Sequence, residues 1–259
     1  MGHLWQRLRQ RSEQRSAARR AIPEPLWQLT LARLPFLARL DSADQAELRR
    51  LSSLFLDSKE FTGAHGLQVT DDMAVAIAAQ ACLPVLRFGL RPYDGFVGIV
   101  VQPDEVKVRR KVVDEDGIVH EYDDVLAGEA MEGGPVMLSW HDVSESGASA
   151  EWGYNVVVHE FAHVLDMGDG VADGIPPLAG ATERQRWQAV LGADYEAFCQ
   201  RVDAEEDTAL DPYGADSPEE FFAVASEAFF VAPVELRMEH PALYELLAGY
   251  YCQDPARRS

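Results

Sequence analysis

The chain has 259 residues, of which 47% are hydrophobic and 25% are charged, so it can bury the core of a globular domain. Its 43 acidic and 23 basic residues give a formal net charge of −20, which repels phosphate and argues against direct nucleic-acid binding. No apolar run approaches the roughly 18 residues that a membrane span requires.

The N-terminus is rich in arginine: residues 1–20 contain six arginines and one glutamate. Such a start occurs in transit peptides and membrane-surface arms, and also in solvated helical extensions, which is the interpretation favoured here. Pro23 and Pro25 interrupt the pattern where the apolar core of a signal peptide would follow. We therefore predict a flexible basic arm over residues 1–22 and one domain over residues 23–259.

The cysteines number three, and no C-x-x-C pair is present. This count argues against a disulfide framework and against a cysteine-rich zinc site. Cys82, Cys199 and Cys252 lie among apolar neighbours, as small core residues do. We expect a cytoplasmic protein.

The N-terminal part of the domain is predicted to be helical. Ser42 with Gln45 is typical of a capping box, and apolar residues recur at three- and four-residue steps, which predicts a helix over residues 42–56. Thr70 can cap a second helix over residues 71–81 that is almost entirely apolar and should therefore be buried.

Strands are predicted after Pro84. The residues favour strands over 97–101, 106–113 and 135–140, and a hairpin tip at Asp116-Gly117. The domain thus divides into an N-terminal helical part, about 23–83, and a sheet and catalytic part, about 84–259. This order predicts an α+β fold with a small mixed β-sheet.

The central motif is His159-Glu160-Phe161-Ala162-His163, an H-E-x-x-H sequence embedded in apolar residues. On a helix, positions four apart share a face, so the two histidines can bind one zinc ion. Glu160 lies about 100° around the helix, where it can accept a proton from water. The pentapeptide also arises by chance, so a third ligand is needed. Of the other histidines His141 is best placed, although a surface position is favoured for it.

Glu220 is the strongest candidate for the third ligand. Ser217 and Pro218 predict the start of an apolar helix on which Glu220 and Glu227 share a face. A carboxylate among apolar residues needs a partner, such as a metal or a metal-bound histidine. Alternatively, Glu220 could close a capping box with Ser217, and Glu227 could be an exposed helix residue.

Two stretches together resemble a known family. H-E-F-A-H-x-x-D at His159–Asp166 and Y-G-x-x-x-x-x-E-F-F-A at Tyr213–Ala223 resemble the Mlc titration factor A family of bacterial cytosolic zinc peptidases. They also resemble the related catalytic domain of anthrax lethal factor. Matches to the first family at residues 81–86, 94–96, 134–138 and 226–230 extend the resemblance over about residues 26–255.

The resemblance implies a zincin-like metallopeptidase in which His159, His163 and Glu220 hold Zn2+. It implies that Glu160 is the general base and that Tyr213 stabilises the oxyanion of the reaction. Without the resemblance, packing of Tyr213 at a helix entry would be the preferred interpretation.

Asp166 and Glu227 are candidates to accept the second ring N–H of a liganding histidine, although Asp166 could instead cap a helix or form a loop salt bridge. Proteins of this kind bind extended peptides along a sheet edge, and residues 135–140 are the expected edge.

The resemblance also implies partners: a peptide or protein substrate, with aminopeptidase-like cleavage, and a transcriptional repressor of sugar uptake. The alternative function is a zinc-containing protein that regulates that repressor by binding it, with little proteolysis.

Overall fold

The computed structural model describes residues 21–104, 106–113, 119–126, 128–130 and 133–258. The predicted arm lies outside these ranges except for its last two residues. Ile22 is buried in the core at 3% exposure, and its carbonyl accepts a hydrogen bond from Arg49. The predicted hairpin tip at Asp116-Gly117 also lies outside the described residues. None of the helices in these ranges is long and apolar enough to cross a membrane.

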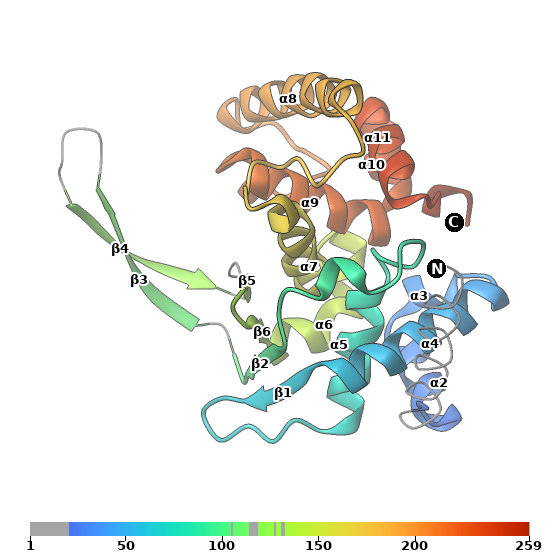
Figure 1. Cartoon of the computed structure of the whole chain (residues 1–259). Helices are drawn as coiled ribbons and strands as arrows, with labels where there is room; N and C mark the ends of the chain where they lie inside the picture. The colour runs from blue at the N-terminus through green and yellow to red at the C-terminus, as the bar shows by residue number, and fades with distance from the viewer. Residues whose placement is uncertain (1–20, 105, 114–118, 127, 131–132, 259) are drawn as a thin grey trace, which may run out of the picture.

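Helices dominate the N-terminal part, including the two predicted at residues 42–56 and 71–81. It contains α2 (Glu24–Arg33), α3 (Pro35–Ala38), α4 (Ser42–Ser58) and α5 (Asp71–Cys82), with β1 (Glu60–Gly63) between the last two. In Figure 1, α2, α3 and α4 gather on one side of the molecule.

The cap of α4 differs from the prediction. Its N-cap is Asp41, whose carboxylate accepts a hydrogen bond from the Asp44 amide at 2.8 Å. Ser42 is the first helical residue instead, because aspartate one position earlier is an equally good cap. Gln45 still folds back over the helix start, where its side chain donates to the Leu40 carbonyl at 2.9 Å.

The main sheet has four strands in the order β1-β2-β6-β5. β2 (Gly98–Gln102) and β6 (Val136–Ser139) continue β1 in parallel, whereas β5 (Gly128–Ala130) pairs with β6 antiparallel. The prediction that residues 135–140 form the sheet edge is therefore wrong, because β6 is an inner strand and β5 lies at the edge. Chain order alone does not determine the spatial order of strands.

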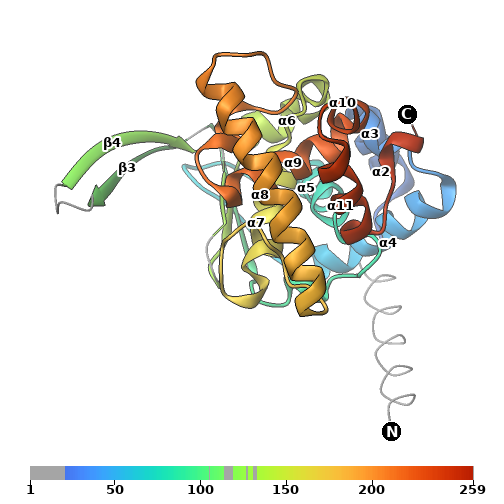
Figure 2. The ribbon, with the colours of Figure 1, turned by 90° about the horizontal axis from the view of Figure 1, so that it is seen from above.

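Two long strands form a separate hairpin. β3 (Val106–Val113) pairs antiparallel with β4 (Val119–Leu126), and β3 has the predicted bounds. In Figures 1 and 2 this hairpin projects away from the rest of the molecule.

The C-terminal part is again helical and confirms the α+β class. It comprises α6 (Trp140–Ser149), α7 (Val156–Asp166), α8 (Ala181–Asp203), α9 (Pro218–Val231), α10 (Pro233–Glu239) and α11 (Pro241–Tyr251), with the short 3-10 turns η2 (Ala150–Trp152), η3 (Met167–Asp169), η4 (Pro212–Ala215) and η5 (Pro255–Arg257). A further 3-10 turn, η1 (Arg91–Tyr93), lies earlier in the chain, between α5 and β2. α7 lies in the centre, in contact with α5, α9 and β5, and α8 covers α9 and α11 (Figures 1 and 2).

The core fixes α7 in place through aromatic side chains. Phe161, fully buried, has its ring centroid 4.9 Å from that of Tyr93, 5.7 Å from that of Phe55 and 6.0 Å from that of Phe96. The expectation that the three cysteines are core residues holds for Cys82, which is buried, whereas Cys199 is half-buried and Cys252 is exposed. A central helix packed this tightly can hold functional side chains in one geometry.

Candidate metal centre

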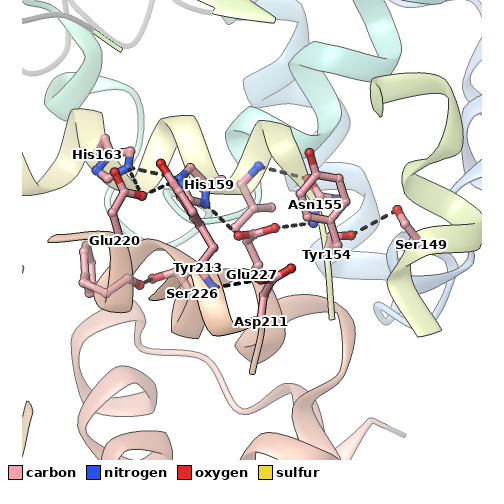
Figure 3. A network of polar contacts seen from close by, with 12 residues as sticks. Ser149, Tyr154, Asn155, His159, His163, Asp211, Tyr213, Glu220, Ser226 and Glu227 are labelled. Carbon is pink, nitrogen blue, oxygen red and sulfur yellow. Dashed lines mark hydrogen bonds and ion pairs between the residues drawn. The ribbon is translucent and has the colours of Figure 1, made fainter. Parts of the chain in front are cut away.

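The helix that carries the H-E-x-x-H motif, α7, begins with a polar cap and continues with buried apolar residues. The Asn155 side chain accepts a hydrogen bond from the Val158 amide at 2.9 Å. Val156, Val157 and Val158 are at most 2% exposed, so the first turn is anchored in the core. This burial leaves the histidine face of α7 pointing toward α9 (Figure 3).

The second helix of the centre, α9, begins as predicted. Ser217 is the N-cap, and Pro218 occupies the first helical position. The Ser217 hydroxyl accepts a hydrogen bond from the Glu220 amide at 3.3 Å. Only the backbone of Glu220 takes part in this cap. The carboxylate of Glu220 faces the two histidines instead of closing a capping box.

Three ligand-type atoms converge between the two helices. His159 Nε2 lies 3.0 Å from Glu220 Oε2, His163 Nε2 lies 3.2 Å from the same oxygen, and the two nitrogens are 3.1 Å apart (Figure 3). Two ligands on a tetrahedral zinc ion, with bonds of about 2.05 Å, are separated by roughly 3.3 Å. The geometry and the two-nitrogen, one-oxygen donor set therefore fit a divalent metal such as zinc.

Glu227 lies behind His159 rather than at the surface, so the alternative of an exposed residue is wrong. It is 2% exposed, and its Oε1 is 2.7 Å from His159 Nδ1. Because an ionised carboxylate only accepts hydrogen bonds, this contact places a proton on Nδ1, so that Nε2, which faces the cluster, is the nitrogen that could bind a metal once its own proton is lost. The other oxygen of Glu227 accepts the backbone N–H of Asn155.

Burial and ion pairing set the electrostatics of the cluster. Burial alone would raise the pKa of Glu220, but hydrogen bonds from His159 and His163 lower it well below its usual range. Burial opposes protonation of His159, yet the charge of Glu227 and hydrogen bonds to Glu220 and Glu227 raise its pKa. Burial raises the pKa of Glu227, and the neighbouring His159 opposes that shift. A metal ion that bound here would therefore have to displace a proton from the imidazole of His159.

Glu160 is buried beside the cluster under the edge strand. It is 4% exposed, and its Oε2 has no hydrogen-bond partner among the described residues. Burial raises the pKa of Glu160 to about 7, although the charges of the two histidines lower it. A carboxyl group with a pKa near neutrality is suited to proton transfer.

We predict that Glu160 lowers the free energy of unfolding of the metal-free protein as the pH rises above about 4.5. Between pH 4.5 and about 7 the folded protein holds a proton on Glu160 that the unfolded chain has lost, so the free energy of unfolding falls as the pH rises. We expect Glu160→Gln to be more stable than wild type by about 3 kcal/mol at pH 8 and by less than about 1 kcal/mol at pH 5. Urea unfolding with a chelator at both pH values measures this, and a pH-independent difference would contradict it.

Gly128 of β5 lies directly against Glu160. A Cβ atom at position 128 would come within 2.3 Å of Glu160 Oε1 and 2.6 Å of its Cγ and Cδ. Only glycine therefore lets the edge strand pass over this side chain in the observed position.

Gly128→Ala is accordingly expected to displace Glu160 and, if Glu160 is the catalytic base, to lower cleavage on the order of 100-fold, with metal affinity changed less than about threefold. Gly192→Ala on α8, where a Cβ meets no atom within 4 Å, is the matched control. Steady-state kinetics and chelator competition measure the two effects. Wild-type activity in Gly128→Ala would show that the contact is not needed.

The other predicted site residues, Asp166, Tyr213 and His141, supply none of the three converging ligand atoms. Asp166 is fully buried, but its Oδ2 accepts the Gly174 amide at 2.9 Å, and no hydrogen bond joins it to His163 in the described part of the chain. Burial raises its pKa to about 6. Tyr213 is 42% exposed, and its ring centroid lies 6.1 Å from that of His159. His141 is exposed on α6 and lies outside the cluster.

The sequence analysis missed two residues behind the cluster, Gln80 and Asn155, and the contact of Gly128. Asn155 carries a signal that could have been used, since asparagine before an apolar helical run is a typical N-cap. Gln80 is the one neutral polar side chain within the apolar residues 73–82. The contact of Gly128 has no local sequence signal.

A cavity of about 970 Å³ lies at the C-terminal end of α7. Its walls include Phe88, Phe96, Val164 and Tyr250, and Arg91 is also part of its lining. His159, His163 and Glu220 do not line it. The size of the cavity alone therefore does not connect it with the cluster.

The fold and this cluster define the class of the protein. An α+β domain that brings a histidine pair from one buried helix to a glutamate from another is a candidate single-metal protein with the ligand set of zinc hydrolases.

The comparison of sequences identifies the family within that class. The chain matches the family described as "Glucose-regulated metallo-peptidase M90" over residues 6–252, and it belongs to this family. It is 38% identical to Mlc titration factor A of Edwardsiella ictaluri over 228 residues, which are 87% of this chain and 86% of that protein. It is 37% identical to Mlc titration factor A of Serratia proteamaculans, covering 90% and 88%. An uncharacterized protein of Synechocystis sp. is 40% identical, covering 91% and 86%.

Proposed function

We propose that this protein is a zinc-dependent peptidase with a zincin-like fold, and that His159, His163 and Glu220 are its zinc ligands. The observation that supports this most is the convergence of their three ligand atoms at 3.0–3.2 Å. Membership in a metallopeptidase family supports the reaction class. The buried Glu160 beside the cluster supports catalysis, because a purely structural site needs no base.

The chain's own residues would divide the work of peptide hydrolysis. Zinc bound in the cluster supplies Lewis acidity, which polarises a carbonyl group and lowers the pKa of water. Glu160 accepts the proton of the attacking water and returns it to the leaving amine. Tyr213 donates a hydrogen bond to the oxygen on which negative charge develops. Glu227 keeps the proton of His159 on Nδ1.

The substrate would lie along β5. This strand is one of the two edges of the four-stranded sheet, and it passes directly over Glu160. Backbone pairing with an edge strand binds an extended peptide with little dependence on its side chains. Gly128 would then position the base and one wall of the substrate site together.

A second function is favoured by the relatives' name. Two of the similar proteins are named Mlc titration factor A, which describes action on Mlc rather than proteolysis. We propose binding of a transcriptional repressor of sugar uptake as the alternative, with zinc as a structural component. Both functions would be exercised in the cytoplasm.

Elemental analysis of the purified protein, combined with cleavage of a mixed peptide library, tests the proposal. We expect one zinc per chain and cleavage that a chelator abolishes and added zinc restores. Peptides with free and with blocked N-termini distinguish aminopeptidase from internal cleavage. Bound zinc without any cleavage would favour the repressor-binding function, and absence of zinc would overturn the metal centre.

A further inference from the structure

A buried glutamine connects the N-terminal helices with the metal centre. Gln80 is fully buried on α5, and its side-chain amide donates to the Ala76 carbonyl of the same helix at 3.1 Å. This donation orients the amide, so that Gln80 Oε1 accepts a hydrogen bond from Asn155 Nδ2 at 2.8 Å. The contact joins residues 75 positions apart in the chain.

Asn155 passes this orientation on to Glu227. Because its Nδ2 is committed to Gln80, its Oδ1 is the atom that caps the Val158 amide at 2.9 Å. The side chain thereby fixes the start of α7, and the backbone N–H of Asn155 donates to Glu227 Oε2. Asn155 is fully buried, so each of these polar atoms depends on its protein partner.

The chain of contacts ends at a predicted metal ligand. Glu227 Oε1 lies 2.7 Å from His159 Nδ1, and Figure 3 shows Asn155, Glu227 and His159 in this sequence, with Glu220 beyond them. Each contact in this series has one possible direction of donation, given the ionised carboxylate. The orientation of the Gln80 amide and the direction in which His159 presents Nε2 to the cluster are therefore coupled.

We infer that Gln80 is a positioning residue for the metal centre, which acts through Asn155 and Glu227 on the tautomer and orientation of His159. This inference rests on the proposed metal site. It assigns α5, in the N-terminal helical part, a role in metal binding. The partners of a ligand's second ring nitrogen commonly contribute 10–100-fold to metal affinity.

The experiment compares two buried glutamines in the full-length protein. Gln80→Met removes the contact to Asn155, and Gln253→Met removes a comparable buried contact, from Gln253 to the Leu83 carbonyl at 2.9 Å, away from the cluster. Zinc affinity is measured by competition with a chromophoric chelator. We expect about a 10-fold loss for Gln80→Met and less than a twofold change for Gln253→Met.

A thermodynamic cycle separates positioning from general destabilisation. A glutamine at position 227 has one acceptor oxygen for the two N–H donors of Asn155 and His159, so the connection between these residues is broken in a Glu227→Gln background. Gln80→Met should therefore cause less than about a twofold further loss there. Gln80→Glu keeps an acceptor for Asn155 and should retain affinity within about threefold. If Gln80→Met does not fold, Asn155→Ser, which keeps a helix cap but has no amide, should show the same 10-fold loss.

Equal affinity of Gln80→Met and Gln253→Met, or an undiminished loss in the Glu227→Gln background, would overturn this inference alone. If wild type binds no zinc, the proposed metal centre fails and the inference fails with it.

Discussion

Glu160→Gln is expected to lower peptide cleavage by about 10²–10⁴-fold while one zinc per chain remains bound. Cleavage should fall because glutamine has nearly the same shape as glutamate but cannot accept a proton. Zinc should stay bound because Glu160 supplies none of the three ligand atoms that converge in the cluster. Steady-state kinetics on a peptide that the wild type cleaves in the mixed library measures the cleavage rate. Elemental analysis of the same sample measures the zinc content.

The control for Glu160→Gln is Glu145→Gln, which also removes one carboxylate but at an exposed position on α6. It should keep both zinc and activity. Cleavage at the wild-type rate by zinc-loaded Glu160→Gln would remove Glu160 from the mechanism. If Glu160→Gln is both less active and more stable than the wild type, the burial of Glu160 lowers the stability of the protein and is retained because catalysis requires it.

Glu220→Ala is expected to abolish stoichiometric zinc binding, and cleavage with it. The carboxylate supplies one of three converging ligand atoms and lies within hydrogen-bonding distance of both histidines. Its removal leaves two nitrogens, one fewer than the three protein ligands that catalytic zinc sites normally have. The loss of zinc affinity should therefore exceed the 10–100-fold that a partner outside the ligand set contributes.

Glu219→Ala is the matched control for Glu220→Ala. Glu219 is the preceding residue on α9 and, like Glu220, is half-buried. Its replacement also removes one negative charge from the first turn of α9, so helix and charge effects are equal in the two variants. A Glu220→Ala protein that retains full zinc and activity would show that the third ligand is a different residue.

Several features of this protein were determined by the sequence alone. The four-residue spacing of His159 and His163 on an apolar helix is a local property, since 3.6 residues per turn places them on one face. The start of α9 at Ser217-Pro218 and the bounds of β3 follow equally from local chemistry. The family, too, could be recognised from two short motifs and is confirmed by the comparison.

Other features were decided only by the tertiary structure. Whether the Glu220 carboxylate closes a cap or faces the histidines, and whether Glu227 is exposed or buried, depends on how α9 packs against α7. The edge position of β5 depends on the spatial order of strands, which differs from their order in the chain. The contacts of Gly128 and Gln80 join residues 32 and 75 positions from their partners Glu160 and Asn155. Local propensity holds no information about such contacts, because their free energy arises only when the core has packed.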